Sequence, residues 1–371
     1  MQKIFDYIIV GAGSAGCVLA NRLTENGKST VLLVEAGGED RNFWLHIPVG
    51  YGKTIADPKV NWKFETEANP ALGGRRIYWP RGKVLGGTSS INGLIYIRGQ
   101  AEDYDLWRQH GNEGWSYEDG LPYFRKAEQQ ENGADAYHGA DGPLAVSNIR
   151  ERNPLCEAYI AAAEALGIPR NPDFNGATQE GAGYFQGTIR RGRRASASVC
   201  YLRPARKRRN LTVMTRTAAL RVLFEGRRAC GVMVQQDGQP FAVTANREVI
   251  LSAGSVKSPH LLMLSGVGNS TDLQANGVQV VHELNGVGQN LQDHYGGQIT
   301  WRCSQPITMN DVMLSKWRQF RAGLRWMLQR DGPLSVPAGQ AGVFTNVLPE
   351  SLTPDLQFLF QTFSGGYYED G

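Results

Sequence analysis

The fold is decided by the stretch Asp6-Tyr-Ile-Ile-Val-Gly-Ala-Gly-Ser-Ala-Gly16 near the start of the chain. Its first five residues are an apolar run that ends at a glycine, which is typical of a buried parallel strand, and a helix is expected from Ser14 to Thr24. A second apolar run, Thr30–Val34, leads to Glu35, 19 residues beyond Gly16. This order of strand, glycine turn, helix, strand and acid predicts a dinucleotide-binding unit.

Each residue of this motif has its own physical role. Gly11 allows the tight turn, Gly13 lets the backbone approach a pyrophosphate, and Gly16 lets the helix pack closely on the strand. The helix that starts at Ser14 directs its first amide groups at the anion. Glu35 favours a free ribose 2′-hydroxyl, because a carboxylate would repel a 2′-phosphate, so NADP is not expected. NAD and FAD both remain open at this point.

A second glycine-rich segment reads Pro80-Arg-Gly-Lys-Val-Leu-Gly-Gly-Thr-Ser-Ser-Ile-Asn-Gly-Leu-Ile-Tyr-Ile-Arg-Gly99. Gly86 and Gly87 can bring backbone N–H groups against a phosphate or the edge of a flavin, and the hydroxyl and amide side chains from Thr88 to Asn92 supply polar contacts. A plain turn would not require this combination. The shorter run Ala36-Gly37-Gly38 is either another ligand-facing segment or an ordinary glycine-rich turn.

Residues 82–105 resemble the first signature of the glucose-methanol-choline (GMC) oxidoreductase family, and the run from Gly254 to Gly268 resembles the second. A strand is expected at Val249–Ala253, immediately before the second signature. The similarity extends from about Asp6 to His294 and more weakly to an expected strand at Asp355–Phe360. Bacterial choline dehydrogenase-like and FAD-dependent alcohol dehydrogenases are the most similar branch. An NAD-dependent enzyme would leave both signatures unexplained.

The resemblance implies an α/β fold with two domains, as the length of 371 residues also suggests. One would be a Rossmann-like FAD/NAD(P)-binding domain, discontinuous, at residues 1–150 and 190–298. The other would be a partial α+β substrate-binding domain, an antiparallel sheet plus helices, at residues 151–189 and 299–371, incomplete at the C-terminus.

The resemblance also implies FAD as the cofactor and assigns contacts by position. Pyrophosphate contacts fall on the Gly11–Gly16 turn, the ribose contact on Glu35, flavin contacts on the first signature, and the adenosine pocket on the later residues. Val213 could instead be a routine inward strand residue. The full set is Gly11, Gly13, Ser14, Gly16, Glu35, Ala36, Val84, Gly86, Gly87, Asn92, Gly93, Leu94, Ile95, Val213, Ala253 and Gly254. Some family oxidases bond a histidine covalently to the flavin, but Ile91 occupies that position, so non-covalent FAD is expected.

The implied reaction oxidises an alcohol, aliphatic or choline-like, to the aldehyde by hydride transfer to flavin N5, with oxygen, a quinone or another carrier as electron acceptor. Such a reaction requires a base, and histidine suits it. None of the six histidines has the family context of that base. We interpret five of them as packing or solvent-contacting residues and His294 as having a local polar role. The full set is His46, His110, His138, His260, His282 and His294. We expect the catalytic histidine beyond Gly371, which makes this sequence a truncated piece, inactive alone. The alternative is a flavin-binding fragment or pseudoenzyme without turnover.

Composition excludes several other classes. A formal charge of +4 and one short basic run give no argument for nucleic acid. Five scattered cysteines without a C-x-x-C pair suggest neither a metal site nor disulfides. The early strand leaves no room for a secretory signal, so a cytoplasmic location is expected, with peripheral association at an inner membrane as an open alternative.

One segment bears on that alternative. Residues 313–330 are predicted to form an amphipathic helix, and two interpretations of it are open: a helix packed on the substrate-domain sheet, which is favoured, and a membrane-surface helix. Its expected sheet-facing residues are Trp317, Phe320, Leu324, Met327 and Leu328.

Overall fold

A computed structural model describes residues 3–364 of the chain. They form two compact units: unit 1 comprises Met1–Asn42, Lys53–Asn92 and Ser196–Gln298, and unit 2 comprises Phe43–Gly52, Gly93–Ala195 and Ile299–Gly371. The division at residue 298 coincides with the expected domain boundary. Residues 93–150, expected in the nucleotide-binding domain, fall in unit 2, because their strands pair with others of that unit.

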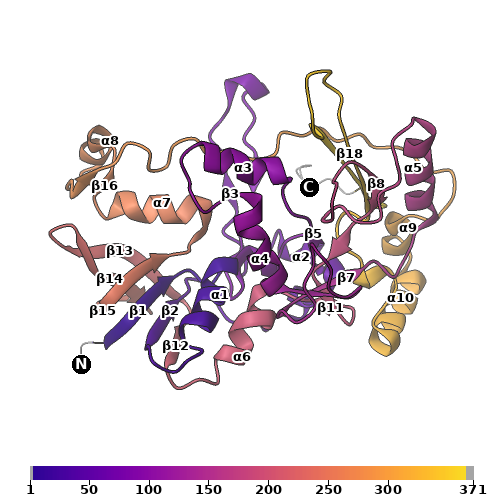
Figure 1. Cartoon of the computed structure of the whole chain (residues 1–371). Coiled ribbons are helices and arrows are strands. Elements are labelled where there is room, and N and C mark those ends of the chain that lie inside the picture. The colour runs from indigo at the N-terminus through magenta and orange to yellow at the C-terminus, as the bar shows by residue number, and fades with distance from the viewer. Residues whose placement is uncertain (1–2, 365–371) are drawn as a thin grey trace. The chain divides into compact units, whose positions relative to one another are not determined.

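Unit 1 is built on a six-stranded sheet, whose strands can be followed in Figure 1. The order is β12 (Leu211–Met214), β2 (Val31–Val34), β1 (Lys3–Val10), β15 (Gln239–Leu251), β14 (Arg228–Gln236) and β13 (Thr217–Glu225). The first four strands are parallel, and the last two extend the sheet in antiparallel fashion.

The register of the parallel strands aligns their carboxyl ends. Val10 lies opposite both Val34 and Leu251, and Val34 lies opposite Met214. The loops that follow these four strands therefore meet at one edge of the sheet, which is where open α/β sheets bind their ligands.

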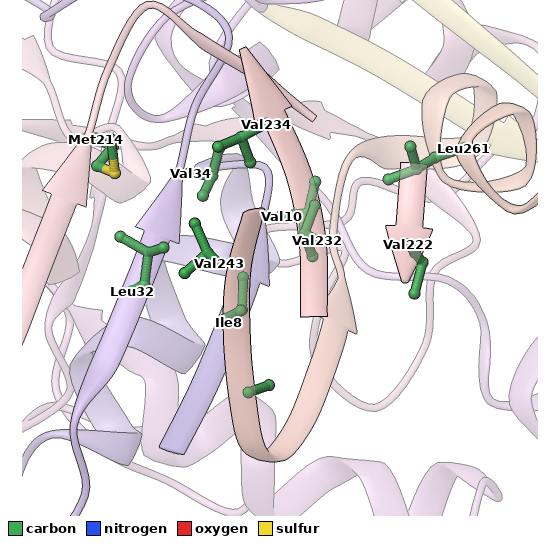
Figure 2. Packing of buried hydrophobic residues seen from close by; sticks show 11 residues of the cluster. Ile8, Val10, Leu32, Val34, Met214, Val222, Val232, Val234, Val243 and Leu261 are labelled. Atoms are coloured by element: carbon green, nitrogen blue, oxygen red, sulfur yellow. The ribbon is translucent and has the colours of Figure 1, made fainter. Parts of the chain in front are cut away.

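The core of unit 1 explains why β1 and β2 are continuous apolar runs. Parallel strands covered on both faces cannot alternate apolar with polar residues. Figure 2 shows Ile8, Val10, Leu32 and Val34 packed in one cluster with residues of the antiparallel strands and with Leu261 of α7 (Gly254–Leu264). Helix α1 (Ser14–Leu23) also packs against β1 and β2.

The other elements of unit 1 are short. They are β3 (Phe64–Glu65), η3 (Pro70–Leu72), β4 (Tyr78–Trp79), η4 (Gly87–Ser90), the π-helical turn η5 (Ser198–Leu202), α6 (Arg203–Ala205), β16 (Val267–Gly268), α8 (Ser270–Ala275) and β17 (His282–Glu283).

Unit 2 contains an antiparallel sheet of β19 (Leu356–Phe360), β18 (Ala341–Thr345) and β8 (Gly181–Tyr184). Helix α5 (Pro154–Ala165) packs on it through Cys156, Ile160 and Ala163. A second sheet has the order β5 (Ile95–Tyr96), β9 (Gln186–Gly187), β7 (Leu144–Asn148) and β6 (Glu128–Gln130). The expected α/β class, with an antiparallel sheet and helices beside the Rossmann-like sheet, is confirmed.

The remaining elements of unit 2 are η1 (Phe43–Leu45), η2 (Pro48–Gly50), α3 (Ala101–Gln109), α4 (Tyr117–Ala127), β10 (Ile189–Arg190), β11 (Arg193–Arg194), α9 (Met309–Met313), α10 (Lys316–Gln329) and η6 (Pro333–Ser335). The sequence of α2 (Tyr51–Thr54) is divided between the two units. Among residues 3–364, no helix combines the length and the hydrophobicity that a membrane span needs.

Helix α10 forms where the sequence predicted a helix, but the predicted sheet-facing side is wrong. Its buried residues are Ala322 and Trp326, and the indole N–H of Trp326 donates to the carbonyl of Gly192 at 2.8 Å. The apolar residues expected to face the sheet are solvent-exposed, namely Trp317, Phe320, Leu324, Met327 and Leu328.

Candidate cofactor-binding site

The glycines of the first turn differ in what surrounds them. Gly11 has a φ of +101°, and a Cβ on it would lie 2.6 Å from the Ser252 carbonyl oxygen. A Cβ on Gly16 would lie 1.9 Å from the Gly11 oxygen. The close approach of neighbouring backbone atoms therefore requires glycine at both positions.

The packing of the chain does not require a glycine at position 13. The φ of Gly13 is −74°, and the nearest described atom to a Cβ would be the Ser252 carbonyl oxygen at 3.8 Å. Gly13 is the N-cap of α1, and no side chain caps that end, so the first-turn N–H groups at Ser14 and Ala15 remain exposed donors. The space beside Gly13 and the uncapped helix end together suit an anion.

Glu35 follows β2 and holds the turn in place. One carboxylate oxygen accepts from the Ala12 N–H and the other from the Gly37 N–H, both at 2.8 Å. Burial raises the pKa of Glu35, and these two hydrogen bonds oppose the rise. A carboxylate has about four lone-pair sites, so two remain for hydroxyl groups, and the ribose contact stays a prediction.

The first signature lies directly on this turn. The Gly86 N–H donates to the Ala12 carbonyl at 2.8 Å, and a Cβ on Gly87 would lie 2.7 Å from the Gly13 Cα. Both glycines have positive φ, +89° and +53°, which other residues rarely adopt. The two glycine-rich segments found separately in the sequence therefore pack directly on each other, Gly86 at Ala12 and Gly87 at Gly13.

The run Ala36-Gly37-Gly38 packs against residues of the first signature. A Cβ on Gly37 would lie 2.0 Å from the Lys83 carbonyl oxygen, and the Leu85 N–H donates to the Gly38 carbonyl at 3.0 Å. Val84 is fully buried and bridges to Gly38. The packing that requires Gly37 is thus with the first signature, and a ligand role for Ala36 stays a prediction.

The predicted adenosine-pocket residues lie at the same sheet edge. Val213, on β12, pairs with Leu33 of β2, and a Cβ on Gly11 would lie 2.8 Å from the Ala253 Cα. Gly254, the first residue of α7, has a φ of +84° with no described atom within 4 Å of a would-be Cβ. These positions suit ligand contact, which remains a prediction for each of them.

The remaining predicted flavin contacts are divided by the unit boundary. Asn92 is the last residue of its segment in unit 1, whereas Gly93, Leu94 and Ile95 belong to unit 2. Leu94 is fully buried with a φ of +65°. Their flavin contacts also stay predictions.

Ser198 is a candidate that the sequence did not reveal. It is buried, its hydroxyl has no hydrogen-bond partner among the described residues, and its Cβ would be 3.1 Å from a Cβ on Gly86. The segment is fastened to the first signature by Ser89, whose hydroxyl donates to the Gly86 carbonyl and accepts from the Ala197 N–H. Buried hydroxyls without partners are rare, so Ser198 suits a ligand atom. The only signal in the sequence was the dense run of small and hydroxyl residues around it.

Unit 1 therefore fits a dinucleotide. It offers an open helix N-terminus, space at Gly13, a carboxylate with free lone pairs and a buried hydroxyl without a partner. Ile91, at the position where a covalent link would form, is a buried aliphatic residue. The expected catalytic histidine beyond Gly371 lies outside the described residues.

His138 has a partner set that the sequence did not predict. Its Nδ1 lies 3.0 Å from Glu128 and its Nε2 lies 2.9 Å from Asp173, within the interior of unit 2. Glu128 is fully buried and also pairs with Arg98 at 2.8 Å. The interpretation of His138 as an ordinary packing residue is therefore too simple, because it is part of an ion-pair network.

Comparison with known proteins gives a consistent result. The family model described as GMC oxidoreductase matches residues 5–296. The chain is 46% identical over 363 residues to a mitochondrial choline dehydrogenase of Mus musculus, covering 96% of this chain and 61% of that protein. It is 48% identical over 336 residues to an oxygen-dependent choline dehydrogenase of Photobacterium profundum, covering 90% of this chain and 59% of that one.

A comparison with solved structures gives the same family. A formate oxidase from Aspergillus oryzae, studied for modification of its FAD, matches with a TM-score of 0.86 at 28% identity, over 93% of this chain and 62% of that one. The chain thus spans about three fifths of the length of the proteins it matches. The predicted cofactor, FAD, is confirmed.

Proposed function

The chain belongs to the GMC oxidoreductase family, and from this premise we propose that its protein oxidises the CH–OH group of a choline-like or aliphatic alcohol with FAD as cofactor. The observation that carries the proposal is the packing of the first signature on the Gly11–Gly16 turn at the carboxyl edge of the sheet, with Gly86 bonded to Ala12 and Gly87 against Gly13. The choline dehydrogenases among its relatives support an amino alcohol as the substrate class.

The residues that would hold FAD follow from the site. The first turn of α1, from Gly13, would receive the pyrophosphate, because its N–H groups are exposed and uncapped. Glu35 would accept from the adenosine ribose with its remaining lone pairs. Gly86, Gly87 and Ser198 would border the same ligand. Bound FAD supplies the two-electron acceptor that the protein side chains lack.

The electron acceptor that reoxidises the flavin, whether oxygen, a quinone or another carrier, belongs to the same proposal. It can be identified by supplying each acceptor in turn to the enzyme after reduction by its alcohol. Rapid reoxidation by air would indicate an oxidase, and reoxidation by a quinone alone would indicate a dehydrogenase.

The test of the function is anaerobic bleaching of the flavin. The longer protein that contains this chain, loaded with FAD, should lose its flavin absorbance on addition of choline or a primary alcohol. N,N,N-trimethylpropylammonium, which keeps the cation and lacks the hydroxyl, is the matched control and should leave the spectrum unchanged. Bound FAD that no alcohol reduces would contradict the proposed function.

A second candidate is a chain that binds flavin without turnover of its own. It is favoured by the fact that these 371 residues span about three fifths of the relatives. The same assay on residues 1–371 distinguishes the two: flavin that is bound but never bleached, beside an active longer protein, would support this candidate for the shorter chain.

A further inference from the structure

Helix α10 presents an apolar stripe to solvent on the side opposite its packed side. Trp317, Phe320, Leu324 and Leu328 follow one another at helical spacing and are 65%, 59%, 45% and 75% exposed. Met313 and Leu314, at the end of the preceding helix α9, are also exposed. Contiguous exposed apolar surface of this kind marks an interaction site.

The orientation of the helix is fixed from its inner side. Trp326 is buried, meets the ring of Phe43 edge-to-face at 6.0 Å, and donates to Gly192. Arg325 pairs with Glu151 at 2.9 Å and with Asp331 at 2.7 Å. These contacts lie within unit 2, so the outward direction of the stripe does not depend on the placement of unit 1.

Two stacked aromatic rings form the N-terminal end of the stripe. Trp317 and Phe320 stack on each other with ring centroids 5.7 Å apart and planes inclined by 22°. Large aromatic side chains of this type combine an apolar body with low conformational entropy, and Trp adds an N–H that suits a boundary between apolar and wet surroundings.

Positive charge flanks the stripe. Residues 312–330 include five basic residues and no acidic ones, and the segment is bordered by Asp311 and Asp331. Arg325 is paired, and Arg330 lies over the Trp326 ring at 4.2 Å. Arg318 donates to the Pro306 carbonyl at 3.0 Å, and its charge helps to lower the pKa of Asp311. In the part of the chain that the structure describes, Lys316 and Arg321 form no ion pair. An apolar stripe with unneutralised cations beside it complements a surface that is both apolar and anionic.

We propose that α10 docks on an anionic lipid bilayer. The stripe would lie at the boundary between headgroups and acyl chains, and Lys316 and Arg321 would contact lipid phosphates, as in amphipathic helices that bind in the plane of a membrane. A second copy of the chain, or another part of a longer protein, could also cover apolar side chains. Neither accounts for the basic flanks without an acidic partner surface, so the charges favour the bilayer.

The experiment is vesicle flotation of the FAD-loaded protein. We expect flotation with phosphatidylcholine vesicles that contain about 30% phosphatidylglycerol, little flotation with phosphatidylcholine alone, and weakening by salt. Lys316→Gln and Arg321→Gln should each lower the affinity about fivefold, from the typical attraction of one cation to an anionic surface. Trp317→Glu with Leu324→Glu should lower it at least about tenfold.

The matched control is Leu166→Glu, which places the same charge on an exposed leucine at the end of α5 in the same unit. It should float like the wild type. Flotation that is insensitive to the α10 variants, or none with either vesicle, would overturn the proposal. Gel filtration without lipid adds a separate arm: a dimer lost in the Trp317→Glu, Leu324→Glu variant would identify a second copy as the occupant instead.

Discussion

At the scale of single residues, the three glycines of the first motif are required for different reasons. Gly11 and Gly16 are enclosed by their own chain, whereas Gly13 faces space that the described chain leaves open. The sequence motif could predict all three but could not separate them, because the separation depends on Ser252, which lies far along the chain. Ser198 and the packing of Gly37 on Lys83 could not be predicted for the same reason, because they also depend on residues distant in sequence.

This difference predicts opposite effects of two matched substitutions. Gly13→Ala should change the free energy of unfolding of the cofactor-free protein by less than about 1 kcal/mol, because the new methyl group would meet only the Ser252 carbonyl oxygen, at an ordinary contact distance of 3.8 Å. It should weaken FAD binding about tenfold or more by occupying ligand space. Thermal unfolding and a fluorescence titration with FAD measure the two effects.

Gly16→Ala is the matched control for that substitution. It should destabilise the cofactor-free protein by at least about 2 kcal/mol, because its methyl group would overlap the Gly11 carbonyl oxygen. Equal stability loss in both variants, or unchanged FAD affinity in Gly13→Ala, would contradict the account of the turn.

Glu35→Gln is predicted to damage both the turn and the ligand site. The amide offers one oxygen where the carboxylate offers two, so either the Ala12 or the Gly37 N–H would face another donor. We expect a loss of about 1–3 kcal/mol in stability and weaker FAD binding. Chemical denaturation with and without FAD measures both, and a variant indistinguishable from wild type in both would refute the role assigned to Glu35.

At the scale of elements, local patterns predicted β1, α1, β2 and α10 close to their observed bounds. The inward side of α10 was not predictable, because periodicity identifies an apolar stripe but not what covers it. The hydrogen bond from Trp326 to Gly192 decides the packed side, and it joins residues far apart in sequence. The network around His138 was hidden for the same reason.

That network predicts a specific pH dependence of stability. The hydrogen bond to Asp173, followed by that to Glu128, raises the pKa of His138 from 6.5 to about 9. A raised pKa means that the folded state holds the proton more tightly, so the stabilisation is complete below pH 6.5 and is lost as pH rises through about 9. The shift corresponds to about 3 kcal/mol.

The variant for this prediction is His138→Gln, which keeps a hydrogen-bonding side chain that does not titrate. The difference in unfolding free energy between wild type and variant should be largest near pH 6 and should shrink toward pH 10. The groups that face the imidazole, namely Glu128, Asp173 and Gln130, and Arg98, which pairs with Glu128, are the same in both proteins. Parallel pH profiles would show that His138 is not held as an imidazolium.

At the scale of the whole molecule, the sequence predicted two domains and the division near residue 298, and the structure has two compact units with a division there. Residues 93–150, expected with the nucleotide-binding domain, belong to unit 2, because Ile95 pairs with Gly187 and no local pattern reveals such a distant partner. The FAD-binding half was predictable because its chemistry is concentrated in short motifs that meet at one edge of one sheet.

The claim that connects these scales is that unit 1 holds FAD without a covalent bond. The most direct measurement is acid precipitation of the purified yellow protein, followed by chromatography of the supernatant. We predict stoichiometric FAD in the supernatant and a colourless pellet, because Ile91 offers no atom for a flavin bond. A pellet that keeps its colour would contradict non-covalent binding, and a supernatant with NAD or no dinucleotide would contradict the site itself.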